Sequence, residues 1–135
     1  MPAKPLGLAV VGSGRIGTLR ATLAAAHPAV NFIAVSDRDP SRAASLAEKV
    51  GAQFHTADNL EAISRPEVSA VVVSTLEVEH TEPVLQALEL GKPVLVEKPL
   101  AVDLATADRL IEAAAKSAGS LHVGRIRVEE KVGPL

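Results

Sequence analysis

The stretch Val10-Val11-Gly12-Ser13-Gly14-Arg15-Ile16-Gly17 puts three glycines between an apolar run and a helical pattern. Residues 6–11 form a short apolar run rich in valine, which predicts a buried strand. The apolar residues that follow recur at helical spacing and predict a helix: Ile16, Leu19, Leu23 and Ala26. The chain is therefore expected to begin with a strand, a glycine turn and a helix.

The three glycines fit the pattern G-x-G-x-x-G, in which each glycine has its own task. Gly12 permits the tight turn, Gly14 lets the backbone approach a pyrophosphate, and Gly17 lets the helix pack close to the strand. The phosphates would lie at the free N–H groups of the helix start, so the charge of Arg15 is optional. We therefore predict a dinucleotide site formed by Gly12, Ser13, Gly14, Arg15, Ile16 and Gly17.

Two other interpretations of this motif stay open from the residues alone. A glycine-rich turn can also join a strand to a helix in a fold that binds no dinucleotide. A methyltransferase is the nearest look-alike, but it usually carries an acid just before the first glycine, where this chain has Val11. The strand before the motif, the helix after it and an acid at the right distance favour the dinucleotide.

Composition limits the classes of function. The 135 residues suit one domain and leave little room for a second. Hydrophobic residues make up 47% and charged residues 22%, which indicates a globular chain. With two Phe as its aromatic residues, the chain has no stacking platform for single-stranded nucleic acid. A net charge of -2 without a Lys/Arg tract argues against binding to nucleic acid or to an anionic membrane.

Cysteine is absent, which excludes disulfides, thiolate metal sites and thiol nucleophiles. The four histidines are scattered, so no metal site is predicted. No run approaches transmembrane length, and the N-terminus offers no secretion signal, so we expect a cytoplasmic protein. The sequence leaves the oligomeric state open, with a homo-oligomer as one option.

Strand-like and helix-like segments alternate, which predicts an α/β fold with a doubly wound parallel sheet. The remaining strands are expected at residues 31–36, 53–55, 70–74, 94–96 and 121–123. The later helices are expected after Asp39, after Asp58, from about residue 80 to Gly91, and from Asp103 to Gly119. The apolar run at 70–74 predicts a central strand. The inner face of the last and longest helix is predicted to be Ala107, Leu110, Ile111, Ala114 and Ala118.

In an open parallel sheet, a ligand lies beyond the carboxyl ends of the strands, where the strand order reverses. Asp37 lies 20 residues past Gly17, where a carboxylate accepts hydrogen bonds from the adenosine ribose hydroxyls. Asp39, before a proline, already serves as a helix cap, which leaves Asp37 for the ribose. A carboxylate there favours NAD. Arg38 could pair with a 2′-phosphate or stack on adenine, so NADP or use of both cofactors stays open.

Polar residues also follow the fourth and fifth strands: Ser74, Thr75, His80, Glu97 and Lys98. Lys98 could donate to a substrate oxygen or relay a proton. It could equally form a solvated ion pair with Glu97. His80 fits either a site residue or a surface group at a helix start, and Thr75 could simply satisfy loop backbone. The acids at 77 and 79 are interpreted as a solvated face.

Four segments, AVVGSGRIG, VSDRDP, VVVSTLEVEH and ALELGKPVLVEKPLA, together resemble the amino-terminal domain of the Gfo/Idh/MocA family, which includes glucose–fructose oxidoreductase and inositol dehydrogenase. The resemblance covers the chain to about Gly124, and residues 91–99 are its most specific part. It implies that Lys98 touches both nicotinamide and substrate hydroxyl and that Glu97 supports the cofactor. It also implies that the nicotinamide half of the site is lined by Ser74, Thr75 and His80.

The chain departs from the family at two points. Leu76 follows Thr75, where the family usually has proline. Family members also continue into a large α/β domain, whose Asp-x-x-x-His pair supplies the acid/base histidine. The last residues here lack the Arg-Phe pattern that leads into that domain. We therefore expect a dinucleotide-binding domain at residues 1–124 and a tail at 125–135 that is the start of a missing or truncated second domain.

The expected function is the NAD(P)-binding domain of an oxidoreductase that transfers hydride between a nicotinamide cofactor and a sugar or cyclitol hydroxyl, with Lys98 as the catalytic residue. The alternative is a non-catalytic dinucleotide-binding module that acts as a sensor or docks on a partner. Chain length favours the alternative, and the presence of Lys98 favours the enzyme. The chain alone is expected to bind NADH without turning over a polyol or sugar, since hydride transfer also needs an oriented substrate.

Overall fold

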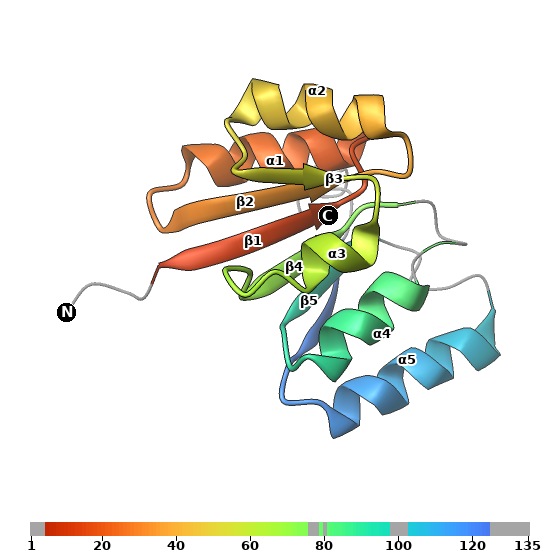
Figure 1. The fold of residues 1–135 in the computed structure, drawn as a ribbon. Helices are drawn as coiled ribbons and strands as arrows, with labels where there is room; N and C mark the ends of the chain where they lie inside the picture. Colours follow the sequence, from red (N-terminus) through yellow and green to blue (C-terminus); the bar gives the residue numbers. More distant parts are fainter. Residues whose placement is uncertain (1–4, 76–78, 80, 98–102, 125–135) are drawn as a thin grey trace, which may run out of the picture.

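The computed structural model describes residues 5–75, 79, 81–97 and 103–124. They form one six-stranded parallel sheet with the strand order β3-β2-β1-β4-β5-β6 (Figure 1). The strands are β1 (Leu6–Val11), β2 (Val30–Ser36), β3 (Phe54–Thr56), β4 (Ala70–Val73), β5 (Val94–Glu97) and β6 (Leu121–Gly124). The helices are α1 (Arg15–Ala26), α2 (Pro40–Val50), α3 (Asn59–Ile63), α4 (Thr81–Glu89) and α5 (Leu104–Lys116). The predicted doubly wound α/β fold is confirmed.

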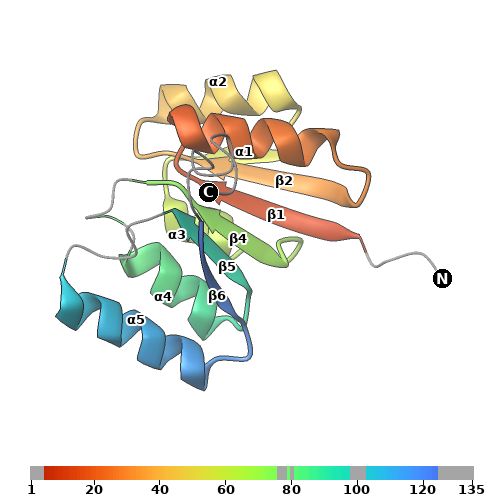
Figure 2. The ribbon, with the colours of Figure 1, turned by 180° about the vertical axis from the view of Figure 1, so that it is seen from behind.

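The helices form a layer on each face of the sheet. Helices α1 and α2 cover one face, and α3, α4 and α5 cover the other (Figures 1 and 2). Alternate residues of the central strands enter the two layers: Val10 packs with α1 and α2, whereas Val11 packs with α3 and α4. Both side chains are fully buried, because a central parallel strand is covered on both faces. The winding reverses between β1 and β4, and β4 is central as predicted.

Helix α1 forms where its spacing predicts, but the leucines of that pattern point outward. Leu19 and Leu23 are 51% and 58% exposed. The residues that α1 buries are small: Gly17, Ala21 and Ala24. Small side chains let the helix axis approach the sheet closely, where a leucine would hold it away. The face that α1 turns to the sheet is therefore a glycine–alanine face.

The predicted inner face of α5 is partly wrong. Leu110 is fully buried, and Ala107 and Ala114 are half-buried, but Ile111 is 56% exposed and Ala118 is exposed. Helix α5 lies at the β6 end of the sheet, where a neighbouring helix, α4, covers it from one side only (Figure 1). Its buried stripe is accordingly narrower than the apolar stripe in the sequence.

Local signals place the ends of several helices. The Asp39 side chain accepts a hydrogen bond from Ser41 N, and the Asp103 side chain accepts one from Thr106 N, as expected of helix caps. Gly51 ends α2 with a positive φ of 71°. Strand β3 begins one residue later than predicted. Gln53, just before it, contacts β2 with both its backbone and its side chain, and its N donates to Ile33 O at 3.0 Å. Its Oε1 accepts from Ile33 N at 2.8 Å.

None of the helices formed by the described residues is long and apolar enough to cross a membrane.

Candidate functional site

The glycine turn between β1 and α1 leaves no room for a side chain at two of its three glycines. Gly12 has a φ of 100°, and a Cβ built on it would lie 2.8 Å from the Ser74 carbonyl oxygen. A Cβ on Gly17 would collide with the carbonyl oxygen of Gly12. Gly14 differs from both, since its φ is −79° and a Cβ there would meet nothing within 4 Å. Gly12 and Gly17 are thus required for packing, whereas Gly14 borders open space.

The start of α1 leaves its N–H groups without a side-chain cap. Gly14 is the N-cap residue, no side chain accepts from the first turn, and that turn holds no acid among the residues described. The first helical hydrogen bond runs from Thr18 N to Gly14 O at 2.8 Å. The N–H groups of Arg15, Ile16 and Gly17 precede it and have no partner within the helix. With the positive end of the helix dipole, they form an anion site beside the space at Gly14.

Asp37 joins the glycine turn to the end of β2. Its Oδ2 accepts from Ser13 N at 2.8 Å, and its Oδ1 accepts from Asp39 N at 2.8 Å. The hydroxyl of Ser13 donates to the Ser36 carbonyl oxygen at 3.0 Å. Ser13 therefore uses its polar groups to hold the turn. Each carboxylate oxygen of Asp37 keeps a further lone pair for a hydroxyl group.

A cavity of about 500 Å³ brings six of the thirteen predicted site residues together. It is lined by Gly12, Gly14, Asp37, Arg38, Asp39, Arg42, Ser74, Thr75 and Glu79. Within the described part of the chain, the buried hydroxyl oxygen of Ser74 has no hydrogen-bond partner. Ser74 lines the cavity, but this oxygen is shielded from solvent, and a buried polar group without a partner costs free energy. Arg15 and Ile16 border the turn but do not line this cavity.

Glu79 lines this cavity and forms an ion pair, whereas it was expected on a solvated face. Its Oε2 pairs with Nη1 of Arg38 at 2.7 Å, and its side chain is 28% exposed. This ion pair links the end of β2 to the residues just before α4. The available sequence signal was its position between Ser74 and His80, in the loop that was already expected to flank the ligand.

Glu97, at the end of β5, pairs with a residue that sequence reasoning missed. Its Oε2 accepts from Nε of Arg20 in α1 at 2.8 Å, and the Arg20 and Glu97 side chains are 29% and 14% exposed. The stretch 16–36 holds no other Asp, Glu, Lys or Arg, which is the one signal that marks Arg20. The ion pair connects the helix of the glycine turn to the strand that precedes Lys98.

His80 and Lys98 lie outside the described residues, as do Leu76 and the expected tail at 125–135. The part of the chain that the structure describes holds no group of three or more His, Cys, Asp or Glu side chains that could bind a metal ion.

Lys92 has a structural role in the segment that is most specific to the resemblance. Its Nζ donates to the carbonyl oxygens of Ile63 at 2.6 Å and Arg65 at 3.2 Å, at the end of α3. Partial burial lowers the pKa of Lys92 below its usual value. The ammonium group satisfies carbonyls that the helix end leaves open. It therefore holds α3 to the loop before β5 and does not line the cavity.

Comparison with known families assigns residues 6–125 to the model described as an oxidoreductase family with an NAD-binding Rossmann fold, Gfo/Idh/MocA. Among curated proteins, the inositol 2-dehydrogenase of Rubrobacter xylanophilus is 37% identical over 109 residues, which are 80% of this chain and 31% of that protein.

Two solved structures illustrate the cofactors found with this fold. GenD2 from gentamicin A biosynthesis, in complex with NAD, is 36% identical with a TM-score of 0.83 over 90% of this chain and 35% of that one. A mutant of KijD10, a 3-ketoreductase from Actinomadura kijaniata, was solved in complex with TDP-benzene and NADP. It is 32% identical, with a TM-score of 0.74, and the match covers 84% of this chain and 36% of that one. The chain thus spans about a third of the length of these relatives.

Proposed function

Because the chain belongs to the Gfo/Idh/MocA oxidoreductase family, we propose that it binds NAD at the carboxyl edge of its sheet, as the cofactor domain of a dehydrogenase. The observation that carries the proposal is the start of α1. An uncapped helix N-terminus, open space at Gly14 and the Asp37 carboxylate meet at one cavity. We take residues 1–124 as the extent of this domain.

The residues fit the three parts of a dinucleotide. The N–H groups at the start of α1 would hold the pyrophosphate, since backbone donors and the helix dipole both favour an anion. Asp37 would accept from the adenosine ribose hydroxyls with its remaining lone pairs. Ser74, with its unsatisfied hydroxyl, and Thr75 would border the nicotinamide half. His80 is proposed for that half and Glu97 for cofactor support by family resemblance.

The proposed reaction is hydride transfer between nicotinamide and the hydroxyl-bearing carbon of a cyclitol or sugar. Bound NAD would supply the hydride acceptor. The named activity of the inositol 2-dehydrogenase relative supports a cyclitol substrate. Lys98 follows Glu97, which α1 fixes through Arg20. We propose that Lys98 donates to the substrate hydroxyl oxygen and relays its proton. The cytoplasm, where a pool of NAD and NADH is available, is the proposed compartment.

The test is a calorimetric titration of the chain with NADH and, in parallel, NADPH. We expect saturable binding of NADH at one site. At a ligand concentration near 100 times the dissociation constant, binding adds about 2.7 kcal/mol to the free energy of unfolding. This amounts to a rise in Tm of roughly 10 °C for a domain of this size. Absence of NADH binding by a folded chain would overturn the proposal. The same sample with NAD and myo-inositol, followed by NADH absorbance, tests for turnover.

A further inference from the structure

The Arg38–Glu79 ion pair stands between two cavities. Both residues line the cavity of about 500 Å³ at the glycine turn. Both also line a neighbouring cavity of about 650 Å³, whose other walls come from the starts of α3 and α4. The Nη1–Oε2 distance is 2.7 Å, so the guanidinium is directed toward the carboxylate. The ion pair therefore separates the two cavities and lies beside Asp37, the proposed ribose acceptor.

A 2′-phosphate on the adenosine ribose would need a cation at this place. Two arginines line the cavity at the glycine turn, Arg38 and Arg42, and each already faces an acid. Arg38 pairs with Glu79, and Arg42 lies 3.9 Å from Asp39. The same lining holds three acids, Asp37, Asp39 and Glu79, so its acids outnumber its arginines. Such a lining disfavours the added negative charge of NADP.

We propose that Glu79 is a specificity-determining residue, which selects NAD over NADP by keeping the guanidinium of Arg38 paired and away from a 2′-phosphate. The inference rests on the proposed cofactor site. It adds a second selector to Asp37, and the two act differently. Asp37 repels the phosphate directly, whereas Glu79 pairs with the Arg38 guanidinium, which would otherwise bind the phosphate.

The ion pair also determines what replacement of Asp37 can show. Replacing Asp37 alone leaves Arg38 bound to Glu79, so the guanidinium is not released. It also removes the acceptor for Ser13 N and Asp39 N, which disturbs the glycine turn. Glu79, in contrast, directs its carboxylate to Arg38 rather than to the backbone of that turn. Its replacement therefore frees Arg38 while the pyrophosphate site stays intact.

The expected change in cofactor preference follows from the solvent exposure of Arg38. The Arg38 side chain is 72% exposed, so solvent and salt screen the ion pair. A phosphate dianion competes well for a guanidinium under these conditions. We therefore expect Glu79→Gln to shift the NADPH-to-NADH affinity ratio by about three- to tenfold toward NADPH. The shift should shrink as salt concentration rises.

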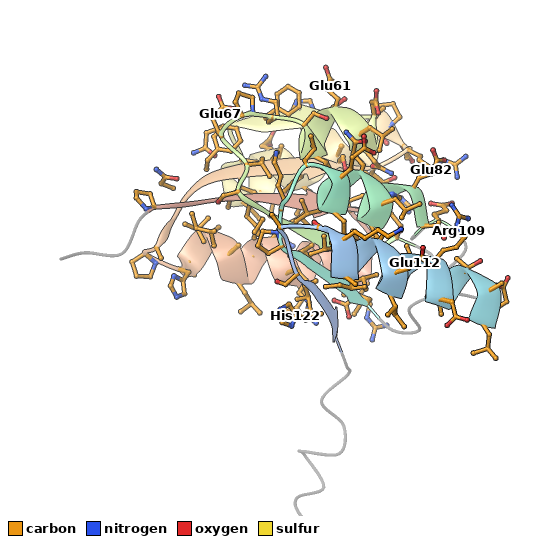
Figure 3. All side chains as sticks on the ribbon, turned by 90° about the horizontal axis from the view of Figure 1, so that it is seen from below. Glu61, Glu67, Glu82, Arg109, Glu112 and His122 are labelled. Carbon is orange, nitrogen blue, oxygen red and sulfur yellow. The ribbon has the colours of Figure 1, made fainter. Side chains whose placement is uncertain are left out.

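The experiment compares dissociation constants for NADH and NADPH across four chains: wild type, Glu79→Gln, Glu79→Gln with Arg38→Gln, and Glu82→Gln. Glu82 is the control for charge, because its replacement removes the same charge nearby, at the exposed start of α4 (Figure 3). It lines the neighbouring cavity but not the cavity at the glycine turn, and it does not pair with Arg38. The expected result is a shift toward NADPH in Glu79→Gln that disappears when Arg38 is also replaced.

Three outcomes would overturn the inference. An unchanged ratio in Glu79→Gln, with NADH still bound, shows that Glu79 does not select. An equal shift in Glu82→Gln shows a general charge effect. A shift that survives replacement of Arg38 shows that the guanidinium is not involved. Failure of wild type to bind NADH removes the proposed function itself and, with it, the basis of this inference, and this result is distinct from the other three.

Discussion

Helices α1 and α2 cover the same face of the sheet and both start at its carboxyl edge, yet their first turns are built in opposite ways (Figure 1). Helix α2 starts from Asp39, whose carboxylate accepts from Ser41 N at 3.0 Å, with Pro40 at its first position. Helix α1 starts from Gly14, without a side-chain cap among the described residues. One start is closed by its own side chain, and the other is open.

The difference separates a structural helix start from the proposed binding start. An aspartate cap satisfies N–H groups within the chain and stabilises the helix. A glycine leaves those groups for a ligand and gives up that stabilisation. Asp37 joins the two starts, since its carboxylate accepts from Ser13 N before α1 and from Asp39 N before α2. The following predictions alter first the start of α1, then the aspartate that joins the two starts, and last the start of α2.

The largest expected effect comes from Gly17→Val, which disturbs the packing of α1 against the glycine turn. A Cβ at this position meets the Gly12 carbonyl oxygen, so the backbone must shift. We expect a loss of about 3 kcal/mol in the free energy of unfolding and a fall in Tm of roughly 10 °C. Thermal unfolding monitored by circular dichroism measures this. A Tm close to that of wild type would show that the turn adapts and that Gly17 is not needed for packing.

The second prediction concerns a variant that adds a side-chain cap to the start of α1. Gly14→Asp gives α1 the cap that α2 already has, in a backbone conformation that any residue adopts. We expect the free chain to gain about 0.3 kcal/mol of stability. NADH affinity should fall by about 100-fold or more, because the carboxylate occupies the anion site and repels phosphate. Calorimetric titration measures the affinity.

The control for that variant is Ala25→Asp, which adds the same charge at an exposed position near the other end of α1. Its NADH affinity should stay within about twofold of wild type, because the charges are well separated and screened. Equal losses in Gly14→Asp and Ala25→Asp would mean that net charge, and not the helix start, governs binding.

The third prediction removes the residue that joins the two starts. Asp37→Ser should weaken NADH binding about tenfold, because a hydrogen bond to a charged group is lost and the glycine turn loses an anchor. NADPH should gain relative to NADH, and the gain should be larger when Glu79→Gln is added, since Arg38 is then released. An Asp37→Ser chain with an unchanged NADH-to-NADPH ratio would remove Asp37 from ribose recognition.

The smallest effect concerns the closed start alone. Hydrogen bonds from Ser41 lower the pKa of Asp39 below its usual value of 3.8. A carboxyl group with a depressed folded-state pKa stabilises the fold above its unfolded pKa, and this contribution is lost as pH falls through the folded pKa. Asp39→Asn should therefore have a lower Tm than wild type at neutral pH. The difference should narrow as pH falls below 3.8. A difference that is constant with pH would contradict this.

Local chemistry explains what the sequence could predict. The glycine turn, the Asp39 and Asp103 caps and the end of α2 at Gly51 each depend on a few adjacent residues, and all were located in advance. Burial was harder. The apolar pattern of α1 predicted the helix, but it could not show that alanines, and not Leu19 or Leu23, would face the sheet. That choice depends on how closely the helix approaches the strands, which is a property of the whole fold.

Two ion pairs between residues distant in the sequence lay beyond sequence reasoning for a different reason. Arg38 and Glu79 are 41 positions apart, and Arg20 and Glu97 are 77 apart. Each pair forms because the parallel fold brings residues that are distant in the sequence to one edge of the sheet, and no periodicity in the sequence predicts such a pairing. The topology was predictable. The particular side chains that meet across it were not, so Glu79 was assigned to a solvated face and Arg20 was not noticed.

The most direct test of the open start is a proton–nitrogen NMR titration of the chain with NADH. We expect the amide protons of Arg15 and Ile16 to move downfield as they bond to the pyrophosphate. The amides of Ser41 and Leu60, which already donate to Asp39 and Asp58, should move far less. Saturable shifts that leave Arg15 and Ile16 unchanged, or that move the capped amides equally, would contradict the claim that α1 begins at the cofactor.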